Sequence, residues 1–452
     1  LLAPGRWLIW ASFELPAIPS NLFGPQSTPN LNKLRVRNIT MQRIVRLMSL
    51  GKQGKRRGRI SYSRLGLNQL GAVYENLLGY SAFFAREALY EVKPKDEKYN
   101  PKLHSFFIKE DQIKDYSTEE RAIGLDGQFI RHEPGEFIYR MAGRNRKNSA
   151  SYYTPESLTQ TTVRYALKEL LPGMPADDIL KLKICEPAVG SAAFLNEAIN
   201  QLADAYLQRK QEETGVNLAP EDYRRERQRC KMFIADRNVV GVDLNGTAVE
   251  LAEVSLWLNS IYQGAFVPWF GMQLFHGNSL VGARRHCWPA SSLHRSRSGE
   301  APIPYDHQNR RRPATSVYHW LVPDEGMAAA ASSKVLAEMC PEQVKAMKAW
   351  RKNFLRPFTE QEIQTARALS DCADQLWWRV EEELDRFERE TTDPLTVWPE
   401  PVTEERPATT ISEKDAILDR LLHSPTSPFC RLQLAMDYWC ALWFWLPEDA
   451  DQ

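Results

Sequence analysis

The chain has 452 residues, of which 43% are hydrophobic and 25% are charged, so it is long enough for two or three globular domains. No apolar run approaches the roughly 18 residues of a membrane span, and the apolar start has no small-residue cleavage site, which favours a cytoplasmic protein. The seven cysteines are scattered without a Cys-x-x-Cys pair and indicate neither a disulfide framework nor a zinc site.

A net charge of +1 hides a strongly basic N-terminal region. Between Pro16 and Tyr74 the sequence has no Asp or Glu but many Lys and Arg. We therefore expect residues 1–60 to form a basic arm, with an exposed loop at 51–58, that contacts a polyanion. The candidate contact residues are Lys52, Lys55, Arg56, Arg57 and Arg59. The alternative is a solvated arm without a partner.

Three further regions are predicted. Residues 61–150 form a helical region, with apolar residues at three- and four-residue steps between Leu67 and Leu78 and with loops and short strands after Tyr90. Residues 151–283 form a core domain. Residues 284–452 form a helical insertion or continuation, in which helices are predicted at 341–354, 360–391 and 413–422.

The core domain alternates between helix and strand. A helix after Pro155 is followed by strands at 182–185, 238–243 and 273–276, and the helices between them start at Ala192 and Thr247. This alternation predicts an α/β fold with a parallel sheet and helices on both faces. In such a sheet, ligands bind at the carboxyl ends of the strands.

The turn after the first strand is the strongest candidate for a ligand site. It starts at Glu186, and the helix that follows offers unpaired backbone N–H groups to a ligand. Small side chains leave room for a ligand to approach the backbone at Ala188, Gly190, Ser191 and Ala192. The alternative is an ordinary tight turn between a strand and a helix.

A second acid, Asp243, ends the next strand, where a carboxylate can accept both hydrogen bonds of a ribose diol. The alternative role is an N-cap for the helix that starts at Thr247. Gly190 and Asp243 lie further apart than the roughly 20 residues usual in a dinucleotide fold. We attribute the excess to a helical insertion at 208–231.

Two other turns belong to the same pattern. Thr154 and Pro155 are typical of the N-cap and first turn of a helix. Downstream, residues 275–280 form a strand that runs into a turn, and its polar tip either faces an adenine edge or is no more than a turn.

In chain order, these motifs are Tyr-Tyr-Thr-Pro at 152–155, Glu-Pro-Ala-Val-Gly-Ser-Ala-Ala-Phe-Leu at 186–195, Gly-Val-Asp-Leu-Asn at 241–245 and Gly-Asn-Ser-Leu at 277–280. They closely resemble the cofactor half of amino-group DNA methyltransferases, most of all the large adenine-N6 enzymes of bacterial restriction and phage-defence systems, including those of the DISARM type. The resemblance implies a Rossmann-like class I S-adenosylmethionine-dependent core flanked by mainly helical regions. It also implies double-stranded DNA, and other subunits of a defence system, as partners.

The resemblance further implies which residues would contact S-adenosylmethionine. The methionine end would lie against Tyr153, Thr154 and Pro155, and the ribose against Asp243, with Leu244 beside it. The floor of the site would comprise Glu186, Pro187, Ala188, Gly190, Ser191 and Phe194, and the adenine would lie near Asn278, Ser279 and Leu280. Two departures stand out: Ala192 where many relatives have a second glycine, and Asn278 where many have Asp.

The catalytic tetrapeptide of these enzymes, Asp/Asn-Pro-Pro-aromatic, is missing, because the chain contains no Pro-Pro dipeptide. No catalytic residue is therefore identified, and we expect the N-terminal portion of a longer enzyme, inactive by itself. Two alternatives stay open: a catalytically inactive DNA-binding subunit on a methyltransferase scaffold, and a methyltransferase that acts on RNA or protein. A nicotinamide-dependent oxidoreductase is disfavoured because the Gly-x-Gly-x-x-Gly spacing is absent from the turn.

Overall fold

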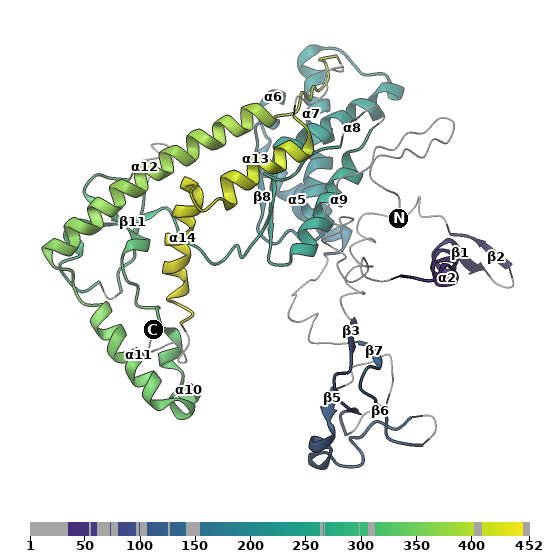
Figure 1. Cartoon of the computed structure of the whole chain (residues 1–452). Coiled ribbons are helices and arrows are strands. Elements are labelled where there is room, and N and C mark those ends of the chain that lie inside the picture. The colour runs from purple at the N-terminus through teal and green to yellow at the C-terminus, as the bar shows by residue number, and fades with distance from the viewer. Residues whose placement is uncertain are drawn as a thin grey trace. The chain divides into compact units, whose positions relative to one another are not determined.

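A computed structural model describes residues 35–53, 56–60, 73, 80–95, 99, 106–124, 127–141, 154–262, 265, 267–297, 299–305, 312–401 and 409–445. The chain divides into two compact units (Figure 1). The core unit comprises Leu1–Gly277 and the short segment Leu395–Val402. The helical unit comprises Asn278–Pro394 and Thr403–Gln452.

The basic arm contains a helix and a hairpin. Helix α2 (Asn38–Ser49) is followed by β1 (Leu50–Gln53) and β2 (Arg56–Arg59), which pair as antiparallel strands. The prediction of an exposed loop at 51–58 is therefore wrong. The two residues that separate Gln53 from Arg56 make a connection of the length that β-hairpins favour, which explains the pairing.

The described part of region 61–150 contains mainly short strands. The strand β3 (Tyr80–Phe84) pairs with β7 (Phe137–Met141), and β4 (Leu89–Val92) lies between β5 (Phe106–Lys109) and β6 (Arg131–His132). A 3₁₀ helix, η2 (Glu110–Asp115), follows β5. The strands expected after Tyr90 are present. The helix predicted between Leu67 and Leu78 lies outside the described residues, apart from Val73.

The core domain has the predicted α/β architecture. Its elements are α5 (Glu156–Leu170), α6 (Ala176–Ile179), β8 (Ile184–Glu186), α7 (Ala193–Thr214), α8 (Pro220–Arg237), β9 (Val239–Asp243), α9 (Gly246–Ser260) and β10 (Leu274–His276). The three strands pair in parallel in the order β10-β9-β8. The stretch 208–231 is helical, as predicted, but it is the end of α7 and most of α8 rather than one insertion.

The first strand starts two residues later than predicted. The Asn238 side chain donates hydrogen bonds to the carbonyl oxygens of Leu180 (3.0 Å) and Leu182 (2.6 Å). These bonds hold the chain ahead of the sheet in a non-strand conformation, so the ladder begins only where Ile184 pairs with Val239.

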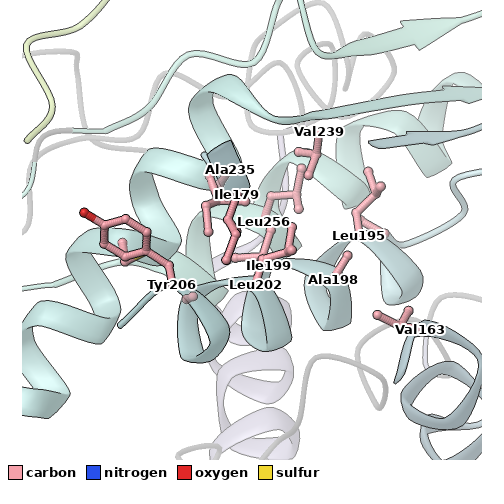
Figure 2. Close-up of a cluster of buried hydrophobic side chains, with 14 of the residues drawn as sticks. Val163, Ile179, Leu195, Ala198, Ile199, Leu202, Tyr206, Ala235, Val239 and Leu256 are labelled. Atoms are coloured by element: carbon pink, nitrogen blue, oxygen red, sulfur yellow. The ribbon is translucent and has the colours of Figure 1, made fainter. Parts of the chain in front are cut away.

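A single apolar core supports the sheet edge of this domain. On α7, Leu195, Ile199, Leu202 and Tyr206 recur at three- and four-residue steps, and each is at most 1% exposed. Figure 2 shows these side chains together with Leu256 of α9 and with residues of α6, α8 and β9. Burial of this stripe fixes α7, and with it the turn that precedes α7.

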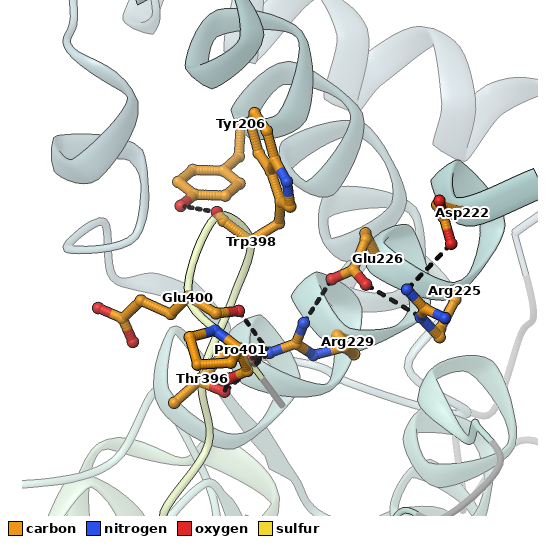
Figure 3. Close-up of polar contacts among 9 residues, drawn as sticks. All are labelled: Tyr206, Asp222, Arg225, Glu226, Arg229, Thr396, Trp398, Glu400 and Pro401. Atoms are coloured by element: carbon orange, nitrogen blue, oxygen red, sulfur yellow. Dashed lines mark hydrogen bonds and ion pairs between the residues drawn. The ribbon is translucent and has the colours of Figure 1, made fainter. Parts of the chain in front are cut away.

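The segment Leu395–Val402 packs on the core unit although it is distant in sequence (Figure 3). The Arg229 guanidinium, with its side chain 3% exposed, pairs with Glu226 at 2.5 Å. Its Nη2 atom also lies 2.7 Å from Thr396 Oγ1 and within 3.2 Å of the carbonyl oxygens of Glu400 and Pro401. The Tyr206 hydroxyl donates to the Trp398 carbonyl at 2.7 Å. A buried, charge-assisted contact therefore anchors this segment.

The described residues of the helical unit form a small sheet and five helices. The strands β11 (His286–Pro289), β12 (Ile303–Pro304) and β13 (Ser316–Tyr318) form an antiparallel sheet in the order β12-β11-β13. Three 3₁₀ turns are η3 (Ala290–Ser292), η4 (His319–Leu321) and η5 (Ala329–Ser332). The helices are α10 (Lys334–Met339), α11 (Pro341–Phe354), α12 (Glu360–Thr391), α13 (Ile411–His423) and α14 (Pro428–Ala441).

Local sequence explains where these helices begin. The Thr359 hydroxyl accepts a hydrogen bond from the Glu362 N–H, and the Glu362 carboxylate accepts one from the Thr359 N–H at 2.8 Å. The same capping box, formed by Thr410 and Glu413, starts α13. The helices predicted at 341–354 and 360–391 are found at those bounds.

Candidate cofactor-binding site

The turn between β8 and α7 has a tightly specified backbone. The Val189 N–H donates to the Val242 carbonyl at 2.9 Å, which ties the turn to β9. Gly190 has a φ of 53°, and Ala192, the residue before α7, has a φ of 62°. The left-handed region favours glycine, so Ala192 adopts a conformation that its side chain makes unfavourable. Many enzymes of the family that this sequence resembles have a glycine at this position.

Asp243 joins the two predicted halves of the site. Its Oδ2 atom accepts a hydrogen bond from the Gly190 N–H at 2.8 Å, and its Oδ1 atom accepts one from the Asn245 N–H at 2.8 Å. The N-cap of α9 is Asn245, whose side chain accepts from the Thr247 N–H. The alternative role of Asp243 as that N-cap is therefore wrong, because Asn245 lies directly before the helix. A carboxylate has about four acceptor positions, so Asp243 can still accept hydrogen bonds from a ligand.

The Glu186 carboxyl group has an unusually high pKa. Its pKa is raised to about 8, mainly by burial; the Leu195 N–H, which donates to Glu186, opposes the rise, and the nearby Asp243 carboxylate adds a smaller contribution to it. Its Oε2 atom is buried without a hydrogen-bond partner. An uncompensated buried oxygen is unfavourable, so this position is suited to a ligand that brings hydrogen-bond donors.

The third strand adds a residue that the sequence patterns did not single out. His276 of β10 pairs in register with Asp243, and its Nε2 atom lies 3.0 Å from the Leu244 carbonyl. The Gly277 N–H donates to the Asp243 carbonyl at 2.9 Å. His276 thus contacts the loop that follows Asp243. Its only sequence signal was its place at the carboxyl end of a predicted strand.

The remaining predicted contacts are distributed as follows. Pro155, not Thr154, is the residue directly before α5, and no side chain caps that helix, so the N-cap role expected of Thr154 is wrong. Tyr153 lies outside the described residues. On the turn, Pro187 and Ala188 are exposed, Ser191 is buried, and Phe194 packs against the apolar core. Leu244 is 60% exposed beside Asp243.

Asn278, Ser279 and Leu280 open the helical unit, and all three are exposed. The Asn278 side chain accepts a hydrogen bond from the Leu280 N–H at 2.9 Å, so the segment is a turn closed by its own side chain. A role at the cofactor adenine stays a prediction.

The basic residues lie on the hairpin of the arm. Arg59 is exposed on β2. Lys52 is on β1, and Arg56 and Arg57 are on β2, where Lys52 pairs with Arg57 in register. Lys55 lies outside the described residues. Their contact with nucleic acid stays a prediction.

Glu186, Gly190 and Asp243 lie together at the carboxyl edge of the parallel sheet of an α/β domain. Residues 135–281 match the family model described as N-6 DNA Methylase. A comparison with curated proteins gives no match.

An N-6 DNA methylase domain implies S-adenosylmethionine as cofactor and DNA as substrate. The residues present fit such a cofactor. The turn at Gly190, the carboxylate of Asp243 and the buried, unpartnered Oε2 atom of Glu186 lie at the same edge of the sheet. Among the described residues, no group of three His, Cys, Asp or Glu side chains could hold a metal ion. No helix in the described part of the chain has the length and apolar character needed to cross a membrane.

Proposed function

We propose that this chain forms the S-adenosylmethionine-binding part of a site-specific adenine-N6 DNA methyltransferase of a restriction or phage-defence system. The observation that carries the proposal is the hydrogen bond from the Gly190 N–H to Asp243 Oδ2, within the segment that matches the N-6 DNA Methylase family. This bond connects the turn at Gly190 to Asp243, the acid that we expect to bind the ribose. Both lie at the carboxyl edge of a parallel sheet, where such folds bind nucleotides.

Each residue of this edge has a distinct role in the proposal. Asp243 accepts the ribose hydroxyls and at the same time holds the turn through Gly190. Glu186 offers its unpartnered oxygen to a donor of the cofactor. Leu244, exposed beside Asp243, offers an apolar surface to the adenine. When bound, S-adenosylmethionine would supply an electrophilic methyl group on its sulfonium.

These 452 residues lack the catalytic tetrapeptide of the family. The amino nitrogen of adenine is a poor nucleophile, because its lone pair is conjugated into the ring. The family's tetrapeptide offers two oxygens to the amino hydrogens and an aromatic ring to the flipped base. The chain has no Pro-Pro dipeptide. We therefore infer that it does not transfer methyl groups without a partner segment that supplies those oxygens.

The basic arm supports DNA rather than RNA or protein as the substrate. Arg43 and Arg46 on α2 are exposed, and β1 and β2 carry further Lys and Arg. A two-stranded ribbon is narrow enough to enter the major groove of DNA, and Lys and Arg contacts to phosphates make binding depend on salt. This arm also favours the second candidate, a DNA-binding subunit that does not use the cofactor.

Two measurements test these proposals. The first is a titration of the purified chain with S-adenosylmethionine, for which we expect weak binding that Asp243→Ala removes. The matched control is Asp236→Ala, an acid of the same domain that lies on α8 away from the turn. Equal binding by the wild-type protein and Asp243→Ala would contradict the cofactor site.

The second measurement incubates the chain with radiolabelled S-adenosylmethionine and duplex DNA. We expect no methylated adenine, and its detection would refute the inference about the missing catalytic half. DNA binding that is tight, sensitive to salt and indifferent to the cofactor, in a chain that does not bind S-adenosylmethionine, would favour the second candidate.

A further inference from the structure

The helical unit contains a pocket of about 430 Å³ that is lined by neither Glu186, Gly190 nor Asp243, although Leu280, which we expect near the cofactor adenine, is one of its walls. All of its walls come from the helical unit, and they include Trp439, Trp443 and Phe444 near the end of α14. Ligand pockets in proteins typically have volumes of roughly 300–1,000 Å³ and combine apolar walls with a few polar groups. The pocket therefore has the size of a small-molecule site.

Its aromatic walls are held in place. The Trp439 Nε1–H donates to the Val322 carbonyl at 3.0 Å, which fixes the orientation of that ring. The His319 ring lies 4.9 Å from the Trp439 ring in an edge-to-face arrangement, and the Trp443 ring lies 5.7 Å from Trp439. Such rings offer flat apolar surfaces to a planar ligand.

One donor in the wall has no acceptor. Trp443 Nε1 is buried without a hydrogen-bond partner, whereas the indole nitrogen of Trp439 is satisfied. Buried donors in folded proteins nearly always have partners, so an unpaired one at a pocket is a specific anomaly. A ligand with an acceptor, such as a ring nitrogen or a carbonyl oxygen, would satisfy it.

Two further groups can bind the edge of a planar ligand. His319 Nε2 lies 2.8 Å from the Arg284 backbone nitrogen and 2.9 Å from the Arg284 carbonyl oxygen, so the Arg284 backbone engages Nε2 in either tautomer. Burial lowers the pKa of His319 to about 4, which keeps this ring neutral at physiological pH. The Asp324 carboxylate, which also lines the pocket, accepts the Gly326 N–H at 2.8 Å and keeps further acceptor positions.

A cation lies at the same pocket. Arg284 lines it with an exposed side chain, and this guanidinium forms no ion pair with any acid in the described ranges. An arginine without a carboxylate partner is a ready site for phosphate, because its planar fork binds two oxygens at once.

We propose that this pocket binds a nucleotide, with the base against the tryptophan walls, an acceptor of the base on Trp443 Nε1–H and the phosphate on Arg284. The ligand is either a free nucleotide or a nucleotide within a single DNA strand, since both present the same base and phosphate. The proposal does not depend on the proposed function, because it is argued from the tryptophan walls, Trp443 Nε1 and Arg284; Leu280 is the one lining residue that we also expect near the cofactor adenine.

The test uses the full chain with Asp243→Ala as background, so that the proposed cofactor site cannot bind the probe. Binding of deoxyadenosine monophosphate and of deoxyadenosine is measured by isothermal titration. Trp443→Phe keeps an aromatic ring but removes the donor, and we expect it to weaken both probes about threefold to tenfold. Arg284→Gln should weaken the monophosphate about tenfold or more and leave deoxyadenosine unchanged.

Trp378→Phe is the matched control, because Trp378 is an exposed indole of the same unit that lines a different cleft. It should bind both probes as the background protein does. A single-stranded oligonucleotide distinguishes the two sources: binding that is tighter than that of the monophosphate, and equally sensitive to Trp443→Phe, assigns the pocket to a DNA strand.

Three results would overturn the proposal: no binding of the monophosphate to the background protein, unchanged binding by both pocket variants, or equal losses in the control. Monophosphate binding by the wild-type protein that is lost in the Asp243→Ala background and retained by Trp443→Phe in the wild-type background would also overturn it, and would leave the proposed cofactor site intact. Circular dichroism of each variant shows whether a loss of binding reflects unfolding.

Discussion

Glu186 gives the sharpest test of the site, because its carboxyl group should titrate far from the ordinary range. In the folded protein burial raises its pKa to about 8, against 4.5 for an ordinary glutamate. Between these values the unfolded chain is ionised while the folded chain keeps the proton. The folded state therefore binds more protons than the unfolded state, and stability must fall as pH rises through this interval.

The size of the effect follows from the two pKa values. Each pH unit within the interval costs about 1.36 kcal/mol, so Glu186 should reduce the free energy of unfolding by about 3 kcal/mol at pH 7 compared with a neutral side chain. At pH 5 the loss should be about 1 kcal/mol. Glu186→Gln removes the titration and keeps an oxygen that can accept the Leu195 N–H, so it should stabilise the protein by about 3 kcal/mol at pH 7 and by only about 1 kcal/mol at pH 5.

The assay is urea unfolding of both proteins at pH 5, 6, 7 and 8. The difference in free energy of unfolding between Glu186→Gln and the wild-type protein should grow steadily with pH. Glu169→Gln, an exposed acid on α5, is the control and should change stability equally at every pH. A pH-independent effect of Glu186→Gln, or titration of the wild-type carboxyl near 4.5, would refute the reasoning.

Three backbone and packing predictions accompany this one. Arg229→Met should destabilise the core unit by about 3 kcal/mol and expose Leu395–Val402 to limited proteolysis, because it breaks a buried ion pair; unchanged cleavage would contradict it. Gly190→Ala should cost about 1–2 kcal/mol, because its φ of 53° disfavours a side chain. Gly241→Ala should lower the free energy of unfolding in urea by about 1–3 kcal/mol, because the new Cβ would lie 2.7 Å from Val189 Cγ2. Gly277→Ala is the control: nothing lies near its Cβ position, so its free energy of unfolding should change by less than about 0.5 kcal/mol.

Local signals were sufficient for much of the fold. The bounds of α12 were predictable because a capping box at Thr359 and apolar residues at helical spacing lie next to each other in the sequence. The hairpin of β1 and β2 was missed because its strands are basic and lack the alternation of a buried strand. The packing of Leu395–Val402 on α7 and α8 was not predictable, since it depends on contacts between residues about 170 positions apart, such as the hydrogen bond from the Arg229 guanidinium to the Pro401 carbonyl.

The candidate site was predictable in its composition but not in its internal contacts. Strand order and small residues indicated Gly190 and Asp243, whereas their direct hydrogen bond depends on the register of the sheet. The raised pKa of Glu186 depends on burial by residues from several elements, which no local pattern records. His276 was passed over because a single histidine at a strand end has no distinctive spacing.

The distance between the glycine turn and the acid along the chain is therefore a poor guide to the site. Gly190 and Asp243 are 53 residues apart, because α8 is added to α7 between the two strands. The parallel pairing of Glu186 with Gly241 nevertheless brings the Gly190 nitrogen to 2.8 Å from the Asp243 carboxylate. A helix can be added between two parallel strands without changing their register, since the added residues pack on the sheet and leave its ladder intact. The site requires only that β8 and β9 end at the same edge of the sheet. The spacing of roughly 20 residues that is usual in dinucleotide folds would have excluded Gly190 and Asp243 as a pair, although the sheet brings them into contact.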